Sequence, residues 1–239
     1  MDRLCETESV LPVLEHASQL RQSDSRPARA VAKLLGPSQS FASGLAWWDC
    51  GVGWYPVTGQ PYNGAYFEKY CGYGRTKMGR DLNKARLDFV GRYYPAGMLC
   101  DVGIGSGSFI NARRQTTFGF DVNPAAIEWL KHRGLLVDPC LVRFPAVTLW
   151  DALEHIEDFS ALLRNCKQWL FLSLPVFRDR EHAERSKHFR PDEHFWYFTA
   201  NGLTHLLDLF GFELVAQNDM ETLLGREDIG TFAYRRRDA

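Results

Sequence analysis

A glycine-rich segment between a predicted strand and a predicted helix constrains the fold of this chain more than any other feature. It reads LCDVGIGSGSF over residues 99–109. Gly103, Gly105 and Gly107 permit a tight turn and leave bare backbone against which a ligand can lie. The following helix start offers free backbone N–H groups. This arrangement is typical of the ligand-binding turn that opens an α/β fold.

The residues around this turn alternate between strand-like and helix-like patterns. Such alternation predicts a parallel sheet with helices on both faces. We expect helices at 76–94, 109–114, 124–133, 158–168 and 200–210, and strands at 98–102, 117–122, 147–150, 169–174, 213–216 and 231–234.

The first part of the chain has a different character. Residues 11–36 contain two short helix-like patterns, and residues 37–64 lack periodicity and are expected to form a loop. The formal charge also changes near Pro95, from +3 over residues 1–95 to −4 over residues 96–239. We therefore expect an N-terminal helical and aromatic-rich extension, 1–95, and a ligand-binding domain, 96–239.

Composition excludes several classes of protein. A content of 45% hydrophobic and 24% charged residues is globular, and a net charge of −1 excludes a generally basic nucleic-acid-binding surface. The six cysteines form no CxxC pair, so no structural zinc site is expected. The start of the chain lacks an export signal, so we expect a cytoplasmic protein with reduced thiols.

The residues of the turn select among nucleotide-like ligands. A dinucleotide fingerprint needs GxGxxG, but the sixth position is Ser108 counted from Gly103 and Ile110 counted from Gly105. The Gly-Lys-Ser/Thr ending of a phosphate-binding loop is absent too. Asp101 stands just before the turn, where it would repel a pyrophosphate and attract an ammonium group. S-adenosylmethionine (SAM) carries an α-ammonium group and no phosphate.

A second acid supports this interpretation. Asp121 closes the next predicted strand, where a carboxylate can accept hydrogen bonds from ribose hydroxyls. The alternative is an ordinary tight turn followed by a helix N-terminal acid. Because both acids stand in register with the turn, we favour the cofactor site.

Five segments together resemble class I SAM-dependent methyltransferases. The similarity covers about residues 96–239 and is greatest to the ubiquinone-type small-molecule branch. It implies a Rossmann-like, seven-stranded, mostly parallel sheet whose last strand is antiparallel. The matching segments are DVGIGSG (101–107), GFDVNPAAIEWL (119–130), VTLWDALEHIEDF (147–159), WLFLSLP (169–175) and 188–215.

The resemblance also implies a set of SAM-binding residues. Asp101 and the turn would hold the methionine part, Asp121 the ribose and Val122 the adenine. The end of the fourth strand would line the methionine end. The expected cofactor-binding residues are Asp101, Gly103, Gly105, Ser106, Gly107, Asp121, Val122, Trp150 and Asp151.

Catalytic candidates are less well defined. In such enzymes the segment around His194 faces the active site, so His194 is a candidate general base, or alternatively a loop anchor. Residues 41–74 hold ten aromatic residues, which can form a lid or stacking pocket or a small core. From this segment we select Tyr66 and Tyr70 as catalytic candidates.

Two further groups of residues have alternative interpretations. Asp151, Glu154 and His155 can hold a divalent cation or serve as structural and capping groups; we favour the structural role and assign no metal ligand. The basic stretch 69–92 can bind phosphates or form a solvated helix face, and the solvated face is favoured.

The sequence therefore predicts a SAM-dependent methyltransferase acting on an O, N or C atom of a small planar acceptor. One alternative is a nucleotide or nucleic-acid methyltransferase that uses the aromatic segment 41–74 and the basic helix 69–92. Another is an inactive SAM-fold binding or scaffold protein. Tight binding of duplex nucleic acid is not expected, because the chain has no general positive charge.

Overall fold

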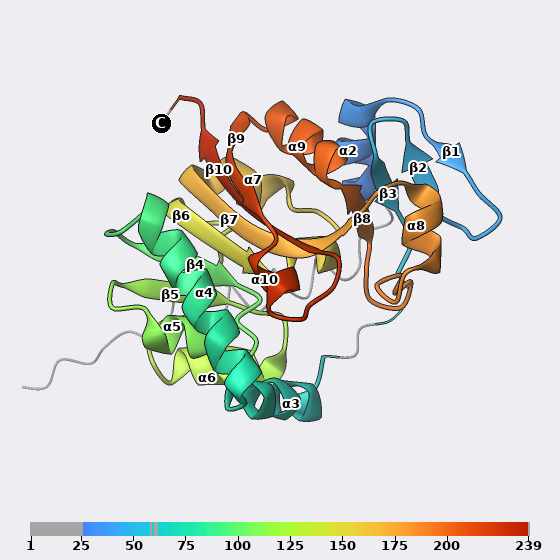
Figure 1. Cartoon of the computed structure of the whole chain (residues 1–239). Coiled ribbons are helices and arrows are strands. Elements are labelled where there is room, and N and C mark those ends of the chain that lie inside the picture. Colours follow the sequence, from blue (N-terminus) through green and yellow to red (C-terminus); the bar gives the residue numbers. More distant parts are fainter. Residues whose placement is uncertain (1–25, 58, 60–61, 239) are drawn as a thin grey trace, which may run out of the picture.

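The computed structural model describes residues 26–57, 59 and 62–238, which fold into a mixed α/β structure (Figure 1). The first helix-like pattern, at 11–16, lies outside the described residues. The helices are α2 (Arg26–Leu35), α3 (Gly64–Gly74), α4 (Lys77–Tyr93), α5 (Ser108–Ala112), α6 (Pro124–Lys131), the 3₁₀ turn η1 (Leu153–His155), α7 (Ser160–Asn165), α8 (Arg180–Arg185), α9 (Ala200–Leu209) and α10 (Met220–Leu223).

The strands form one continuous sheet. Its central part runs β5-β4-β6-β7, and these neighbours pair in parallel. The strands are β1 (Gln39–Ser40), β2 (Ala46–Trp48), β3 (Val52–Trp54), β4 (Leu99–Val102), β5 (Thr117–Phe120), β6 (Phe144–Trp150), β7 (Cys166–Phe177), β8 (Trp196–Thr199), β9 (Phe212–Asn218) and β10 (Ile229–Arg236).

The predicted Rossmann-like topology is confirmed. The last strand, β10, pairs antiparallel with both β7 and β9. Beyond β5, the only pairing among the described residues is an isolated parallel bridge between Gly119 and Leu136. In the expected seven-stranded sheet, a further edge strand would lie beside β5. The segment before β6 occupies this position but forms only a single bridge.

The prediction of a loop over residues 37–64 is wrong for β1, β2 and β3, and the start of α3 also falls within it. Each of these strands has only two or three residues, too few to show alternation. They pair because β8 offers an edge: β7 and β8 run parallel, and β3 adds antiparallel to β8. Gly53 is needed in β3, because a Cβ there would lie 2.6 Å from the Trp47 ring.

Helices cover the sheet on both faces. The helix predicted at 76–94 is α4, and the Thr76 side chain caps it by accepting a hydrogen bond from the Gly79 N–H. Phe89 of α4 packs edge-on against Phe171 of β7, and α4 crosses the front of the sheet in Figure 1. On α9, Leu203 and Leu206 belong to a separate apolar cluster that also contains Val31 of α2.

The topology places three predicted site segments at one edge of the sheet. Strand β4 lies between β5 and β6, so the chain leaves it toward one side and later returns on the other. Ligands in such sheets bind outside the carboxyl ends of the strands at this switch point. Asp121 follows β5, the glycine turn follows β4, and Asp151 follows β6.

The aromatic segment 41–74 divides into two parts. Trp48 is buried, and its indole N–H donates to the Gly36 carbonyl oxygen, so the part around β2 belongs to the core. Tyr66 and Tyr70 lie on α3 and line a cavity. The first half therefore forms part of the core, and the second half contributes aromatic side chains to a cavity; a lid or stacking role stays a prediction.

None of the helices in the described ranges has the length and apolar character required to cross a membrane.

Candidate functional site

A cavity of about 900 Å³ lies at the carboxyl ends of the central strands. Its wall contains the glycine turn, Asp121 after β5, Asp151 after β6, and side chains from α3 and α4. The expected SAM-site residues that line it are Asp101, Gly103, Gly105, Ser106, Asp121, Val122, Trp150 and Asp151.

The glycine turn has the backbone conformation that its sequence predicts. Gly103, Gly105 and Gly107 have φ values of 74°, 53° and 71°, which L side chains rarely adopt. A Cβ on Gly107 would lie 2.6 Å from the Trp129 ring, so this glycine allows close packing against α6. A Cβ on Gly105 would lie 3.7 Å from Tyr70. Bare backbone at Gly105 therefore faces an aromatic ring from α3.

Asp101 is buried near the end of β4. It is 1% exposed, and its Oδ1 accepts a 2.6 Å hydrogen bond from the Thr148 hydroxyl of β6. Burial raises the pKa of Asp101 to about 7, although the Thr148 hydrogen bond and the charge of Arg86 oppose this shift. A cationic ligand group beside Asp101 would restore its ionised form.

Asp121 lies where the chain leaves β5. Its Oδ1 accepts a 2.8 Å hydrogen bond from the Asn123 N–H. Burial raises the pKa of Asp121 to about 6, against the effect of backbone N–H groups that include those of Ile104 and Gly105 in the glycine turn. Val122 is 41% exposed and lines the cavity beside it. Asp121 can therefore accept hydrogen bonds from the hydroxyl groups of a ligand, next to the apolar surface of Val122.

Asp151 belongs to a buried ion network. It accepts hydrogen bonds from Arg86 of α4 at 2.9 Å and from Arg226 at 2.8 Å, and both arginines also pair with Glu221 of α10. Burial opposes ionisation, but the two guanidinium groups lower the pKa of Asp151 to about 2. Trp150 covers this network, with its ring centroid 5.1 Å from the Arg86 guanidinium carbon.

Three tyrosines from α3 and the residues before it form the wall opposite the turn. The Tyr66 and Tyr70 hydroxyls lie 3.2 Å apart, with ring centroids 4.9 Å apart. Tyr62 packs edge-on against Tyr66. Burial and the hydrogen bond to Tyr70 raise the pKa of Tyr66, so this hydroxyl stays protonated and can donate a hydrogen bond to a ligand.

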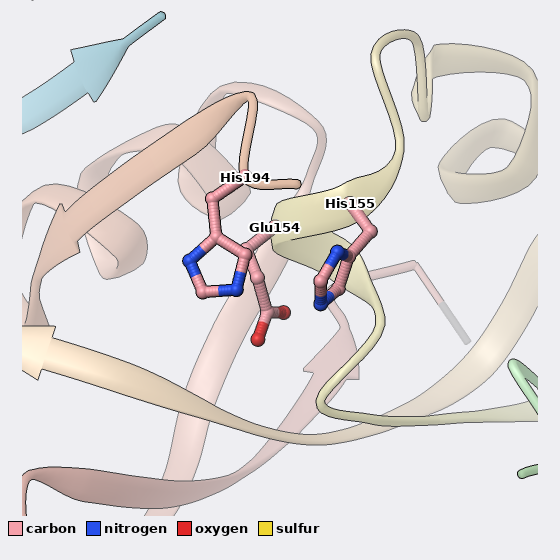
Figure 2. Close-up of side chains that lie close together, drawn as sticks. All are labelled: Glu154, His155 and His194. Atoms are coloured by element: carbon pink, nitrogen blue, oxygen red, sulfur yellow. The ribbon is translucent and has the colours of Figure 1, made fainter. Parts of the chain in front are cut away.

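The structure brings His194 next to Glu154 and His155 (Figure 2). The two imidazole centroids are 4.5 Å apart. Burial lowers the pKa of His155 to about 4, and burial together with the neighbouring His155 and Arg190 lowers that of His194 to about 2. Burial and the charge of Asp151 raise the pKa of Glu154. Both imidazoles are therefore neutral near pH 7.

Several residues of the site have no sequence signal. Arg86 stands within the basic stretch 69–92, and nothing in that pattern separates it from its solvated neighbours. Thr148 and Glu221 meet their partners only through long-range packing. Tyr62 is one of many aromatic residues in its segment. Only the contacts of the folded chain distinguish these four residues from other residues of the same type.

The remaining positive charges of 69–92 are mostly external. Lys77 pairs with Asp81, and Lys84 with Asp88, and the lysine side chains are 86% and 76% exposed. The prediction of a solvated helix face is thus confirmed for these positions, whereas Arg86 points inward and Lys69 lines the cavity.

Comparison with known proteins identifies the fold. Residues 73–217 match the model of a family described as methyltransferase domain. Magnesium protoporphyrin IX methyltransferase from Synechocystis PCC 6803, solved with bound SAH, is 13% identical, with a TM-score of 0.53 over 72% of this chain and 93% of that one. Comparison with curated protein sequences finds no match.

Two further solved structures share the fold. An amino pentose methyltransferase from Micromonospora echinaspora, with SAM bound, is 19% identical, with a TM-score of 0.52 over 75% of this chain and 99% of that one. A structure named as a [4+2]-cyclase is 14% identical, with a TM-score of 0.51 over 76% and 98%. Similarity to the ubiquinone-type branch stays a prediction, since none of these comparisons tests it. The family match covers more than half of the chain, which therefore belongs to the methyltransferase domain family, with S-adenosyl-L-methionine as its cofactor.

Proposed function

We propose that this protein transfers the methyl group of SAM to an O, N or C atom of a small planar acceptor bound beneath α3. The observation that carries the proposal is one shared cavity. The glycine turn with its two acids forms one side, and Tyr62, Tyr66 and Tyr70 form the other. The Tyr70 ring lies 3.7 Å from the Cβ position of Gly105, so any acceptor that stacks on these rings lies close to the cofactor turn.

The binding roles follow from the chemistry of the lining residues. Asp101 would accept the α-ammonium group, and Asp121 the ribose hydroxyls. Gly103, Gly105 and Ser106 would lie along the methionine part, and Val122 against the adenine. Trp150 and Asp151 would close the methionine end, where Asp151 acts through the arginines that it holds. Gly107 would act indirectly by letting α6 pack against the turn.

The chemistry requires alignment more than a strong base. Methyl transfer from a sulfonium is an in-line displacement, and holding the acceptor against the methyl carbon supplies much of the rate. Tyr66 and Tyr70 would orient the acceptor through their hydroxyls. His194 is neutral and would act through its lone pair, because a base with a pKa of about 2 takes up a proton weakly near pH 7.

The contacts of α4 count against the nucleic-acid alternative. The exposed lysines that would follow a phosphate backbone are already paired with Asp81 and Asp88. Few phosphates would therefore be neutralised. We expect duplex binding to be weak and to depend little on salt concentration, since the salt dependence grows with the number of neutralised phosphates.

Calorimetry and an acceptor screen test the proposed function. The protein should bind SAM and SAH with micromolar affinity and should not bind NAD. Labelled methyl should then appear in at least one class of planar hydroxyl, amine or carbon acceptor. Binding of NAD without SAM would refute the cofactor assignment. Binding of SAM with no transfer to any class would favour a binding or scaffold protein. The [4+2]-cyclase structure indicates that the fold is not limited to one activity.

A further inference from the structure

Glu154, His155 and His194 form a compact group of ligand atoms in the cavity wall. Each residue offers one such atom, and these atoms all lie within 4.8 Å of one another. Figure 2 shows the Glu154 carboxylate between the two imidazole rings. Two of the residues come from η1, and His194 comes from the segment before β8. All three line the cavity that also contains Asp101 and Gly105.

An unpartnered carboxylate oxygen points to a ligand at this position. Glu154 is 2% exposed, and within the described part of the chain its Oε2 has no hydrogen-bond partner. Burying a carboxylate oxygen without a partner costs free energy, and native structures rarely tolerate it. The backbone at this residue is joined to the segment that carries His194, because the Phe195 N–H donates to the Glu154 carbonyl oxygen at 2.9 Å.

The hydrogen bonds of His155 orient its ring for ligation. Its Nδ1 lies 3.0 Å from the Glu193 carbonyl oxygen and 3.0 Å from the Tyr62 hydroxyl. A carbonyl oxygen can only accept, so Nδ1 carries the proton and Nε2 presents a lone pair. Metal-binding histidines commonly use this arrangement, in which a backbone carbonyl fixes the tautomer and the direction of the free nitrogen.

We propose that Glu154, His155 and His194 bind a divalent transition-metal ion, with Zn²⁺ as the best-fitting ion. Two imidazoles and one carboxylate are the three protein ligands of many open zinc sites, in which the fourth position is left to water or substrate. Mg²⁺ fits less well, because it prefers oxygen ligands in an octahedral arrangement. Ligand atoms around Zn²⁺ lie roughly 3.3 Å apart, so small rotations of the three side chains would close the site.

This donor set differs from the one that the sequence pattern suggests. Asp151 precedes Glu154 by three residues, but Arg86 and Arg226 already hold both of its oxygens. His194 replaces it, although it lies about forty residues further along the chain. The metal ion would then lie in the acceptor part of the cavity. Resting on the proposed function, we infer that it would bind a hydroxyl or amine of the acceptor and position it for transfer.

Metal binding can be measured without any acceptor. The full chain, treated with a chelator and dialysed, is titrated with Zn²⁺ by calorimetry and with Co²⁺ by visible absorption. One equivalent of each ion should bind, and millimolar Mg²⁺ should not compete. Glu154→Gln and His194→Gln should each weaken Zn²⁺ binding by about a hundredfold or more, because loss of even an outer-shell partner typically costs about 10–100-fold. His205→Gln, on the exposed face of α9, is the matched control and should not change it.

Each result of this experiment decides the proposal. Absence of saturable Zn²⁺ binding, or affinity unchanged in both cavity variants, would overturn it. A thiolate-to-cobalt charge-transfer band would also overturn it by assigning the ion to a cysteine. Thermal unfolding and SAM binding by the same variants show whether they are folded. Metal binding in a protein that binds SAM but methylates nothing would support the site and refute only the proposed function.

Discussion

The Thr148 hydroxyl donates a 2.6 Å hydrogen bond to Oδ1 of Asp101, and both side chains are buried between β4 and β6. One carboxylate oxygen is thereby fixed, which leaves the other for a ligand. Because burial raises the pKa of Asp101, the free protein holds an acid whose ionised form is costly. A cationic group of a ligand beside Asp101 would add to the opposing charge of Arg86 and favour the ionised form.

The first prediction concerns the replacement Asp101→Asn. The amide cannot form an ion pair with the ammonium group of SAM, so affinity should fall by about 1.5–3 kcal/mol. The same change should raise the melting temperature of the free protein at pH 8, because a buried charge is removed. Calorimetry with SAM and thermal unfolding without it measure the two effects. Unchanged SAM affinity would remove Asp101 from the site.

The second prediction is a bell-shaped pH dependence of SAM affinity. Asp101 has a raised pKa of about 7, so its binding-competent ionised form increases as pH rises from 6 to 8. Below pH 7 affinity should therefore rise by up to about tenfold per pH unit. Above about pH 8 it should fall again, since an α-amino group loses its proton near there. Titrations at several pH values measure both limbs, and Asp101→Asn should remove most of the rising one.

The sequence predicts the parts of this site that local chemistry determines. A turn with positive φ values favours glycine, and Asp101 stands in the strand that leads into this turn. The order of residues alone therefore predicts Asp101, Gly105 and Asp121 as parts of one site. The fold places them in one cavity, as adjacent parallel strands require.

The parts that the sequence does not predict depend on distant contacts. The ion pairs of Arg86 join α4 to Asp151, which follows β6, and to Glu221 of α10. No periodicity in the sequence marks these pairs. The strands β1 to β3 are too short to show a pattern and exist because β8 offers them an edge. His194 joins Glu154 only because the segment before β8 returns to η1.

The third prediction concerns the buried ion network. Arg86→Met leaves Asp151 and Glu221 with Arg226 as the remaining cation of the network, although Glu221 is fully buried. Removing one partner of a buried network typically costs about 3–5 kcal/mol. Lys84→Met is the control, since its pair with Asp88 is exposed and worth less than about 1 kcal/mol. Chemical denaturation of both variants should separate them clearly; equal stabilities would contradict the prediction.

The fourth prediction separates acceptor binding from cofactor binding. Tyr66→Phe removes the hydroxyl that contacts Tyr70 but keeps the aromatic face. We expect a several-fold rise in acceptor KM with SAM affinity unchanged. Tyr94→Phe, which removes a hydroxyl bonded to the Met98 carbonyl oxygen outside the cavity, should change neither. A loss of SAM affinity in Tyr66→Phe alone would move this tyrosine to the cofactor side of the cavity.

The fifth prediction compares two helical glycines that differ only in their surroundings. A Cβ on Gly202, near the start of α9, would lie 2.2 Å from the Gly51 carbonyl oxygen. That carbonyl also accepts a 2.8 Å hydrogen bond from the Thr199 N–H, so it cannot move without breaking the joint between the N-terminal strands and α9. By contrast, a Cβ on Gly91 of α4 would meet nothing within 4 Å.

Gly202→Ala should therefore destabilise the protein by about 1–3 kcal/mol, the typical effect of inserting a carbon into a packed site. Gly91→Ala should stabilise it by about 0.5–1 kcal/mol, because alanine favours the helix. For a chain of this size, each kcal/mol shifts the melting temperature by about 2–4 °C. Thermal unfolding should thus move in opposite directions for the two variants. A melting temperature for Gly202→Ala at or above that of the unmodified protein would show that Gly51 yields, and that the N-terminal strands are not held in place by this contact.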